Sequence, residues 1–290
     1  MSAAPVLEDV SDTARWVAYY RALESERPDA LFRDPLARRL AGERGRVMAE
    51  RMAKLALPWA IAVRTRVYDE LVLEAVEQDR AEAVVNLAAG MDTRPYRLSL
   101  SRSLHWVELD LPHIIEAKSV ALANESASCA VERIGLDVSD RDALGAALDR
   151  VMSQHSSVVV VTEGLLAYLD DDIVSDLARE LHARPAIRSW VLEAALPEVV
   201  ERNQRAWGKH LQSAGAAMRF APVNGINYFR DQGWTVRKQR SCLLEARRLG
   251  REPPFAGLLH LAKSLTPRGR EWLQNVVVYG TVERAKPSAA

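Results

Sequence analysis

The chain has 290 residues, and its 39 Lys and Arg residues equal its 39 Asp and Glu residues in number. Because no net charge attracts anions, neither nucleic acid nor a membrane surface is predicted as a partner. The two cysteines and six histidines lack the spacing of metal ligands, so no metal and no disulfide framework are expected. No apolar run would span a membrane and no signal-peptide pattern begins the chain, which predicts a cytoplasmic protein.

The first 57 residues are predicted to form a helical cap. Apolar residues at helical spacing follow Ser11-Asp12-Thr13, which resembles an N-cap region. Asp34-Pro35 is predicted to open a second helix, and a third is predicted from about Trp59 to Glu77. No strand pattern precedes residue 83, so this cap is expected to pack beside a sheet.

From residue 83 onward, apolar runs alternate with helical patterns. The runs suited to buried parallel strands are 83–88, 104–109, 129–134, 157–162 and 187–193, and the helical patterns between them are 112–123, 140–152 and 171–182. Two later strands are predicted at 233–241 and 274–283, separated by a loop containing Pro253-Pro254. The alternation predicts an α/β fold with a mostly parallel sheet, helices on both faces and a late antiparallel strand.

The alternation stops after residue 195. A polar helical stretch at 197–214 and a segment with glycine and proline follow. An insertion there would lie over the carboxyl ends of the strands, where ligands bind in open α/β sheets. We therefore predict one structural unit, composed of the cap (1–57) and an α/β domain (58–290) with an insertion at about 195–230.

Residues 84–94, Val-Val-Asn-Leu-Ala-Ala-Gly-Met-Asp-Thr-Arg, are the most informative part of the sequence. Small residues at the end of a strand let a ligand approach the backbone, and the next strand ends in Glu108 and Asp110. A carboxylate at that place can accept hydrogen bonds from both hydroxyls of a ribose. Each feature alone is also common in ordinary strand ends, but together they predict a nucleoside cofactor.

Five segments in the same order resemble the leucine carboxyl methyltransferase-like family of S-adenosylmethionine-dependent methyltransferases, and especially its bacterial branch. They are Phe32–Ala37, Val63–Arg66 with Asp69, Asn86–Arg94, Val107–Pro112 with Lys118, and Thr162–Leu169. The resemblance spans roughly residues 12 to 240 and implies a Rossmann-like class I methyltransferase fold. Where Ala88 stands the family usually has glycine, and alanine there costs little only if its φ is negative.

The resemblance implies a role for the residues around the loop. Ala88, Ala89 and Gly90 should face the methionine part of S-adenosylmethionine. Asp110, with Glu108 nearby, should accept hydrogen bonds from the ribose hydroxyls.

Further cofactor contacts are implied at the neighbouring strands. Asp137 should hold the adenine amino group and Val138 should donate from its backbone, although helix capping near Ser139-Asp140 explains Asp137 nearly as well. Arg64 should pair with the methionine carboxylate, with a surface ion pair as the alternative. Glu163 should meet the methionine ammonium; since it follows four valines, it is expected to have a partner.

Three functions are considered for such a sequence: methyl transfer, nicotinamide-dependent redox chemistry and binding of an adenosyl ligand without turnover. A nicotinamide-dependent oxidoreductase would need a Gly-x-Gly-x-x-Gly cradle, whereas here Asp92 follows Gly90 and would repel a pyrophosphate. A non-catalytic protein that binds an adenosyl ligand remains an alternative. The favoured function is O-methyl transfer to a small-molecule carboxylate or hydroxyl, with secondary metabolism suggested by natural-product enzymes in the resembled branch.

No residue in the sequence stands out as a general base. Tyr168, His210 and Tyr228 are weak candidates, and surface or core roles are more common for such residues. A carboxylate acceptor, with a pKa near ~4, is already ionised at neutral pH and needs no base, unlike a phenol near ~10. The sequence therefore favours catalysis by proximity and a carboxylate acceptor, and it leaves the oligomeric state open.

Overall fold

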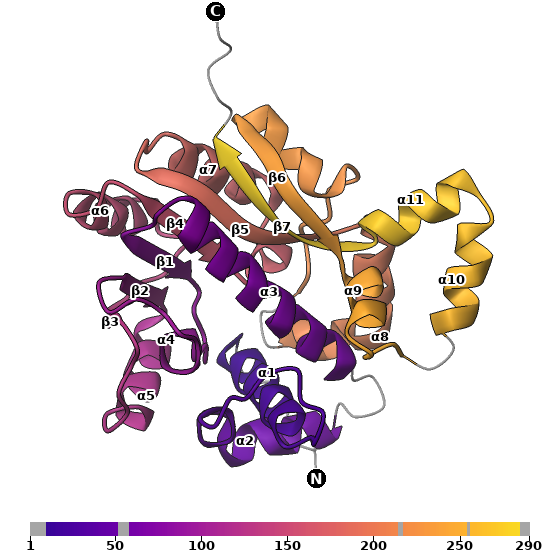
Figure 1. Ribbon diagram of the computed structural model, residues 1–290, viewed down its shortest axis with the longest axis horizontal. Helices are drawn as coiled ribbons and strands as arrows, with labels where there is room; N and C mark the ends of the chain where they lie inside the picture. Colours follow the sequence, from indigo (N-terminus) through magenta and orange to yellow (C-terminus); the bar gives the residue numbers. More distant parts are fainter. Residues whose placement is uncertain (1–9, 52–57, 214–216, 254–255, 285–290) are drawn as a thin grey trace, which may run out of the picture.

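A seven-stranded sheet forms the centre of the computed structural model, which describes residues 10–51, 58–213, 217–253 and 256–284 (Figure 1). The strand order is β3-β2-β1-β4-β5-β7-β6. The strands are β1 (Ala83–Leu87), β2 (His105–Asp110), β3 (Ala130–Gly135), β4 (Val158–Thr162), β5 (Ile187–Ala195), β6 (Trp234–Ser241) and β7 (Val277–Arg284). The first five pair in parallel, and β7 runs antiparallel to both β5 and β6. The predicted α/β class and the late antiparallel strand are thus confirmed.

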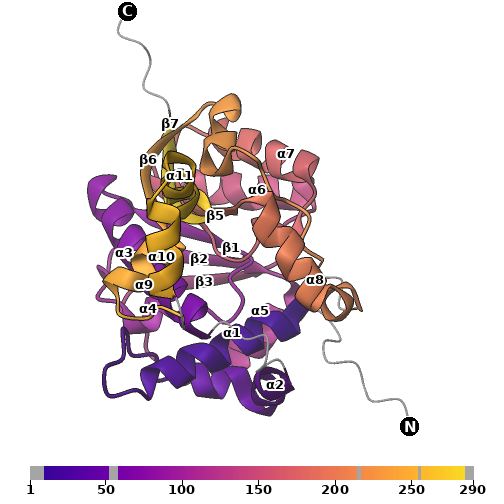
Figure 2. The ribbon, with the colours of Figure 1, turned by 90° about the vertical axis from the view of Figure 1, so that its right-hand side faces the viewer.

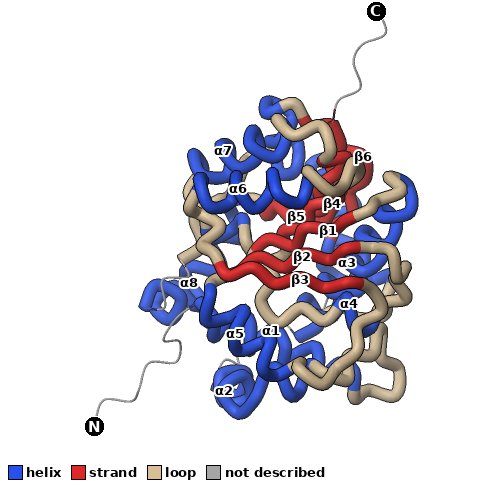
Figure 3. The backbone as a smooth tube through the Cα atoms, turned by 90° about the vertical axis from the view of Figure 1, so that its left-hand side faces the viewer, coloured by secondary structure: helices blue, strands red, loops and turns tan. Residues whose placement is uncertain are grey.

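Helices cover both faces of the sheet (Figure 3). The helices α3 (Pro58–Gln78) and α9 (Cys242–Arg248) pack on one face, against side chains that include Val84 and Val161. On the other face, α6 (Arg141–Met152) and α7 (Asp171–His182) pack on side chains that include Val85 and Val160. Every residue of β1 and β4 is buried, so side chains on both faces are covered, and both strands are mainly apolar, with four consecutive valines in β4.

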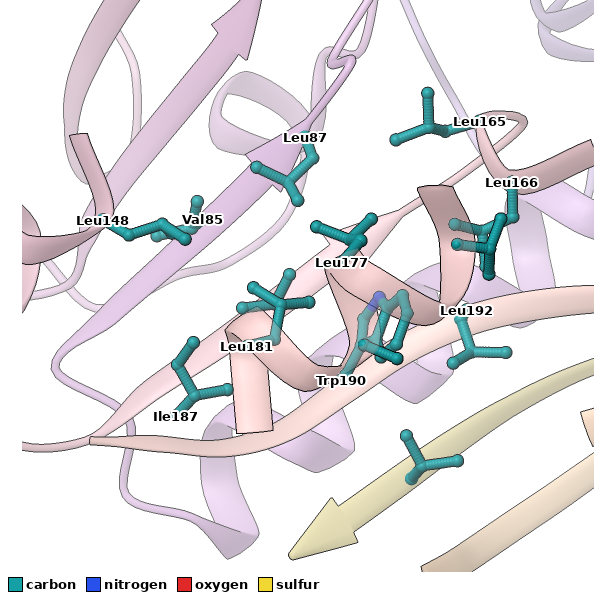
Figure 4. Close-up of a cluster of buried hydrophobic side chains, with 14 of the residues drawn as sticks. Val85, Leu87, Leu148, Leu165, Leu166, Leu177, Leu181, Ile187, Trp190 and Leu192 are labelled. Atoms are coloured by element: carbon teal, nitrogen blue, oxygen red, sulfur yellow. The ribbon is translucent and has the colours of Figure 1, made fainter. Parts of the chain in front are cut away.

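The larger core lies under α7. Figure 4 shows Leu177 and Leu181 of α7 near Ile187 and Trp190 of β5, all of them in one buried cluster. The indole of Trp190 is fully buried, and its Nε1 donates a hydrogen bond to Oγ1 of Thr162 at 2.9 Å. This hydrogen bond gives the buried indole N–H of Trp190 an acceptor at the carboxyl end of β4, where Glu163 follows in the sequence.

The N-terminal helices form a layer below the sheet (Figure 2). The helices α1 (Val10–Ser25) and α2 (Ala37–Arg51) share a buried cluster with α5 (Pro112–Ala121). Contrary to the sequence prediction, Ser11-Asp12-Thr13 lies inside α1 rather than before it, and α2 begins after Asp34-Pro35 rather than at it. Gly42, with φ of 59°, interrupts α2 with a kink.

The prediction of a loop between β6 and β7 was wrong. That connection contains α9, α10 (Ala256–Ser264) and α11 (Pro267–Asn275). The start of α11 was readable in principle, since Thr266 caps Gly269 and Pro267 occupies the first turn. The helix α10 exposes several leucines, so its sequence lacks the one-sided apolar pattern that identifies a packed helix.

After β5, the predicted helical stretch is present as α8 (Pro197–Ser213), which begins at the carboxyl end of β5. The short 3-10 helices η1 (Leu166–Tyr168) and η2 (Gly225–Gln232) and the helix α4 (Arg94–Arg97) complete the fold. Within the described segments, no helix is long and apolar enough to cross a membrane. The same segments hold no group of three or more His, Cys, Asp or Glu residues arranged for a metal ion.

Candidate functional site

The loops that follow β1, β2, β4 and β5 meet at one edge of the sheet, because these four strands are parallel. The loop after β1 makes a sharp turn there. Ala88 has φ of 54° and Gly90 has φ of 47°, both in the left-handed region. Alanine was expected to cost little only at a negative φ, and this condition is not met at Ala88, since the left-handed region costs an L-residue about 1–2 kcal/mol.

The turn lies directly against the cap. A Cβ atom added to Gly90 would lie 3.1 Å from Cβ of Ala14 on α1, which is tighter than almost all real contacts. Ala89 is buried, and its amide donates to the carbonyl of Leu109 on β2 at 3.2 Å. The close approach of α1 and β2 therefore favours small residues in this turn.

Asp110 at the end of β2 fixes this turn. Its Oδ2 accepts a hydrogen bond from the amide of Gly90 at 2.6 Å, and its Oδ1 accepts one from the amide of Leu111 at 2.7 Å. Burial raises the pKa of Asp110, while these two hydrogen bonds act in the opposite direction. An ionised carboxylate has about four acceptor sites, so both oxygens can still accept from a ligand.

Glu108 does not share this position. Its side chain is fully buried, with Oε1 2.9 Å from Nζ of Lys118 and Oε2 2.9 Å from Nε of Arg133. Because both oxygens already contact cations, the expected contact of Glu108 with a ribose does not fit this structure. Glu108 instead joins β2 to α5 and β3; Lys118 belongs to the same resembling segment, but its contact with Glu108 and that of Arg133 were not predicted.

Arg94, just after the turn, is the centre of a buried ion network. Its side chain is 2% exposed and contacts three carboxylates, which are Asp69 at 2.9 Å, Asp92 at 2.9 Å and Glu163 at 2.7 Å. Burial opposes the ionisation of Asp92 and Glu163, yet the charge of Arg94 holds the pKa of each carboxyl below its usual range. Arg94 thereby ties together α3, the turn after β1 and the end of β4.

The network continues into the cap. Arg97 contacts Asp69 at 2.5 Å and lies 3.9 Å from Asp34, which in turn contacts Nε of Arg21 on α1 at 2.9 Å. Thr93 donates to the same carboxylate at 2.6 Å. Asp34, which the sequence suggested only as a helix start, therefore anchors the cap to the loop after β1.

Arg64 and Glu163, the two residues expected at the methionine end, lie side by side. Nε of Arg64 is 2.9 Å from Oε1 of Glu163, and Nη1 of Arg64 is 3.8 Å from Oε1 of Glu193 on β5. The expectation that Glu163 has a partner is confirmed, and it has two, Arg64 and Arg94. A guanidinium beside a carboxylate is the chemical complement of an amino-acid zwitterion.

Asp137 and Val138 lie at the carboxyl end of β3, apart from this network. Asp137 is exposed, and its Oδ1 accepts from the amide and the hydroxyl of Ser139 at 2.8 and 2.7 Å. The N-cap of α6 is Asp140, which accepts from the amide of Ala143. Asp137 therefore makes a local turn rather than the helix cap, and Val138 is partly buried against the core.

Of the two weak base candidates whose side chains the structure describes, Tyr168 lies with the cluster and Tyr228 does not. Burial raises the pKa of Tyr168, the charge of Arg64 lowers it and the charge of Glu193 raises it. The hydroxyl of Tyr228 instead donates to Asp171 at the start of α7 at 3.0 Å. His210 lies on α8, and its side chain is outside the described part of the chain.

Sequence reasoning assigned no role to Arg94 or Glu193. A signal for Glu193 exists, because a carboxylate interrupts the apolar run Val191-Leu192-Glu193-Ala194 near the end of a central strand. Arg94 lies in one of the segments that resemble the family, but the local sequence does not show that Asp69 and Glu163, which are distant in the chain, join Asp92 as its partners.

The parallel sheet with its antiparallel β7, the turn after β1 and the acid at the end of β2 define a class I methyltransferase. The model of the leucine carboxyl methyltransferase family matches residues 14–182, more than half of the chain. The chain belongs to this family, which confirms the resemblance, and it is an S-adenosylmethionine-dependent methyltransferase.

Relatives that carry the name S-adenosyl-L-methionine-dependent methyltransferase occur in actinobacteria. One from Streptomyces coelicolor is 37% identical over 186 residues, which cover 60% of this chain and 65% of the relative. One from Streptomyces avermitilis is 32% identical, with 77% of this chain and 82% of the relative covered. One from Mycolicibacterium paratuberculosis is 31% identical, with 83% and 86% covered.

Two crystal structures show the same fold. One, from Thermobifida fusca and described as a methyltransferase, has a TM-score of 0.64 and 14% identity and covers 97% of this chain and 96% of its own. The other, a DUF574 family protein from Streptomyces avermitilis, has a TM-score of 0.60 and 13% identity and covers 94% and 97%. At these identities the likeness concerns the fold alone.

The positive φ of Ala88 leads to a first prediction. Ala88→Gly should stabilise the protein by about 1 kcal/mol, because it removes the left-handed strain and outweighs the extra chain entropy of glycine. The free energy of unfolding from urea titration measures the effect. Ala89→Gly is the matched control; Ala89 has no positive φ, so this variant should lose stability. A loss of similar size in both variants would contradict the assignment of strain to Ala88.

A second prediction concerns the buried network. Arg94→Met should lower the free energy of unfolding by about 3–5 kcal/mol, because three buried carboxylates lose their shared cation. Arg46 provides the control: it also contacts two carboxylates, Glu43 and Glu50, but it is exposed on α2. Arg46→Met should leave stability nearly unchanged. Similar unfolding midpoints for Arg94→Met and the unchanged protein would contradict the claim that the ion pairs of Arg94 stabilise the fold.

Proposed function

We propose that this protein is an O-methyltransferase that acts on a small-molecule carboxylate or hydroxyl. The observation that carries the proposal is the Arg64–Glu163 pair, 2.9 Å apart at the carboxyl edge of the sheet and close to the turn held by Asp110. S-adenosylmethionine has a carboxylate, an ammonium and a ribose diol. The described residues offer a partner for each of these groups.

Arg64 would bind the methionine carboxylate through two N–H groups of its planar guanidinium, and Glu163 would accept from the ammonium. In the present structure the two side chains pair with each other, so each exchanges an internal contact for one of opposite charge on the ligand. Asp110 would accept from the ribose hydroxyls. Ala88, Ala89 and Gly90 would line the methionine part.

Asp137 and Val138 complete the proposed cofactor site at the adenine end. The exposed carboxylate of Asp137 would accept from the adenine amino group, and the amide of Val138 would donate to the ring. The position of both residues at the carboxyl end of β3, next to β2, supports this arrangement.

Bound S-adenosylmethionine supplies a methyl group whose bond to sulfur breaks, leaving the electron pair on sulfur, as the acceptor oxygen bonds to the carbon. The protein's contribution is to hold the acceptor oxygen in line with that bond, which accounts for most of the rate in such transfers. Burial raises the pKa of Tyr168, so its hydroxyl is protonated at neutral pH. Tyr168 can therefore position the acceptor, but it does not act as the base that removes a proton from the acceptor. These features favour an acceptor that is already ionised, such as a carboxylate.

The segments after β5 supply the acceptor side of the proposed site. The helix α8, visible in Figure 2, and the segment that contains η2 follow the carboxyl end of β5 in the chain. The amide of Arg219 donates to the carbonyl of Ala167 at 2.7 Å, which attaches this insertion to the loop after β4. The resemblance to natural-product enzymes supports an acceptor from secondary metabolism.

A third prediction tests the cofactor and separates the alternatives. S-adenosylhomocysteine should raise the melting temperature by preferential binding to the folded state, and NAD should not. A screen of small carboxylic acids and phenols with methyl-labelled cofactor then tests turnover. A shift with NAD alone would favour a dinucleotide enzyme, whereas a shift with S-adenosylhomocysteine and no acceptor in a broad screen would favour a binding protein.

A fourth prediction tests the ribose contact. Asp110→Ala should weaken the binding of S-adenosylhomocysteine by about 1–3 kcal/mol, because charged hydrogen bonds to the ligand and to the Gly90 amide are lost. Calorimetric titration provides the dissociation constant. Asp176→Ala on the surface of α7 serves as the control and should bind normally. Equal affinity of Asp110→Ala and the unchanged protein would exclude the ribose assignment.

A further inference from the structure

The buried ion network at the carboxyl edge has more carboxylates than cations. Consecutive ion pairs join five carboxylates, Asp34, Asp69, Asp92, Glu163 and Glu193, to four guanidiniums, Arg21, Arg64, Arg94 and Arg97. Every side chain in this series is at most 17% exposed, so solvent screens these charges weakly. The neighbouring group of Glu108 and Asp110 beside Lys118 and Arg133 is balanced.

The least compensated member of this network is Glu193. Among the described residues, its single cation contact is Nη1 of Arg64, at 3.8 Å, and Arg64 is already 2.9 Å from Glu163. The amide of Gly164 donates to Oε1 of Glu193 at 2.7 Å. Burial and the charge of Glu163 raise the pKa of Glu193, against the effect of Arg64. The Gly164 amide and Arg64 stabilise the charge of Glu193, whereas burial and Glu163 oppose it, so the described residues only partly neutralise this carboxylate.

The groups around Glu193 add no further cation. Tyr68 on α3, Tyr168 on η1, Tyr279 on β7 and Cys242 on α9 all interact with its charge, and burial raises the pKa of each of them. These side chains are therefore neutral at neutral pH. Among the described residues, Arg64 is the single cation that lowers the pKa of Glu193.

We infer that Glu193 supplies the uncompensated negative charge by which the site prefers the cationic cofactor to its neutral product. The inference rests on the proposed function. S-adenosylmethionine carries one carboxylate, one ammonium and one sulfonium and is a net cation, whereas S-adenosylhomocysteine lacks the sulfonium charge. Arg64 and Glu163 address charges that both molecules have, so the surplus carboxylate is what distinguishes them.

This difference would act on each reaction cycle. Loss of the sulfonium charge leaves the surplus carboxylate of Glu193 without a counterion on the ligand. The site therefore binds the product more weakly. Coulombic interactions at partly buried positions are several times stronger than in water, so one charge is enough to change affinity about tenfold.

The test compares the two ligands by calorimetric titration in three variants of the full chain. Glu193→Gln keeps the shape of the side chain and removes its charge; it should lower the affinity for S-adenosylmethionine about tenfold and change that for S-adenosylhomocysteine by less than about twofold. Glu163→Gln, the matched control, should weaken both ligands by a similar factor, because both have the ammonium. Glu193→Asp retains the charge and should keep the preference for the cation.

The ratio of the two affinities decides the outcome. An unchanged ratio in Glu193→Gln contradicts the inference, whether both affinities fall together, as for a residue that only positions Arg64, or neither changes. If Glu193→Gln does not fold, loss of the preference in folded Glu193→Asp would also overturn the inference, since that variant retains the charge. Failure of the unchanged protein to bind either ligand would refute the proposed function instead.

Discussion

The buried guanidinium of Arg94 is the constraint on which the rest of this structure depends. A charge with 2% exposure is stable only when it is paired, and Arg94 contacts three carboxylates that come from α3, the turn after β1 and the end of β4. These three segments are far apart in sequence. Apolar side chains of α3, β1 and β4 share a buried cluster, and at the edge itself the ion pairs of Arg94 join the three segments. The ion pairs therefore set the geometry of the edge.

The same network prepares the edge for a charged ligand. Because Glu163 is held by both Arg94 and Arg64, its carboxylate is ionised and fixed before a ligand arrives. Asp34, Arg21 and Thr93 extend the network into the cap, so the helix that lies against Gly90 is attached to the turn that it covers. A preorganised site of this kind does not spend ligand-binding energy on ordering its own side chains.

The sequence predicted the parts of the fold that follow from periodicity. The valine-rich strands and the amphipathic α7 have burial patterns that local sequence specifies, and β1, β4 and α7 were found within a residue of their expected limits. The partner of Glu163 was also predictable, since a carboxylate after four valines needs a cation. Its identity was not, because Arg94 and Arg64 come from other parts of the chain.

Structural features that do not follow from the periodicity of the sequence were not predicted. The sign of φ at Ala88 depends on how the turn fits between α1 and β2, and the burial of Glu108 depends on Lys118 and Arg133 reaching it from separate elements. Likewise, α10 exposes its leucines and so lacks the usual pattern of a packed helix. In each case a long-range contact, or the lack of one, determined the outcome.

A crystal structure of the complex with S-adenosylhomocysteine tests the central claim most directly. The account predicts that the ribose hydroxyls lie on Asp110, that the methionine carboxylate lies on Arg64 and the ammonium on Glu163, and that Arg94 keeps its three carboxylates. A ligand bound elsewhere, or bound at this edge without contact to Arg64 and Glu163, would contradict it.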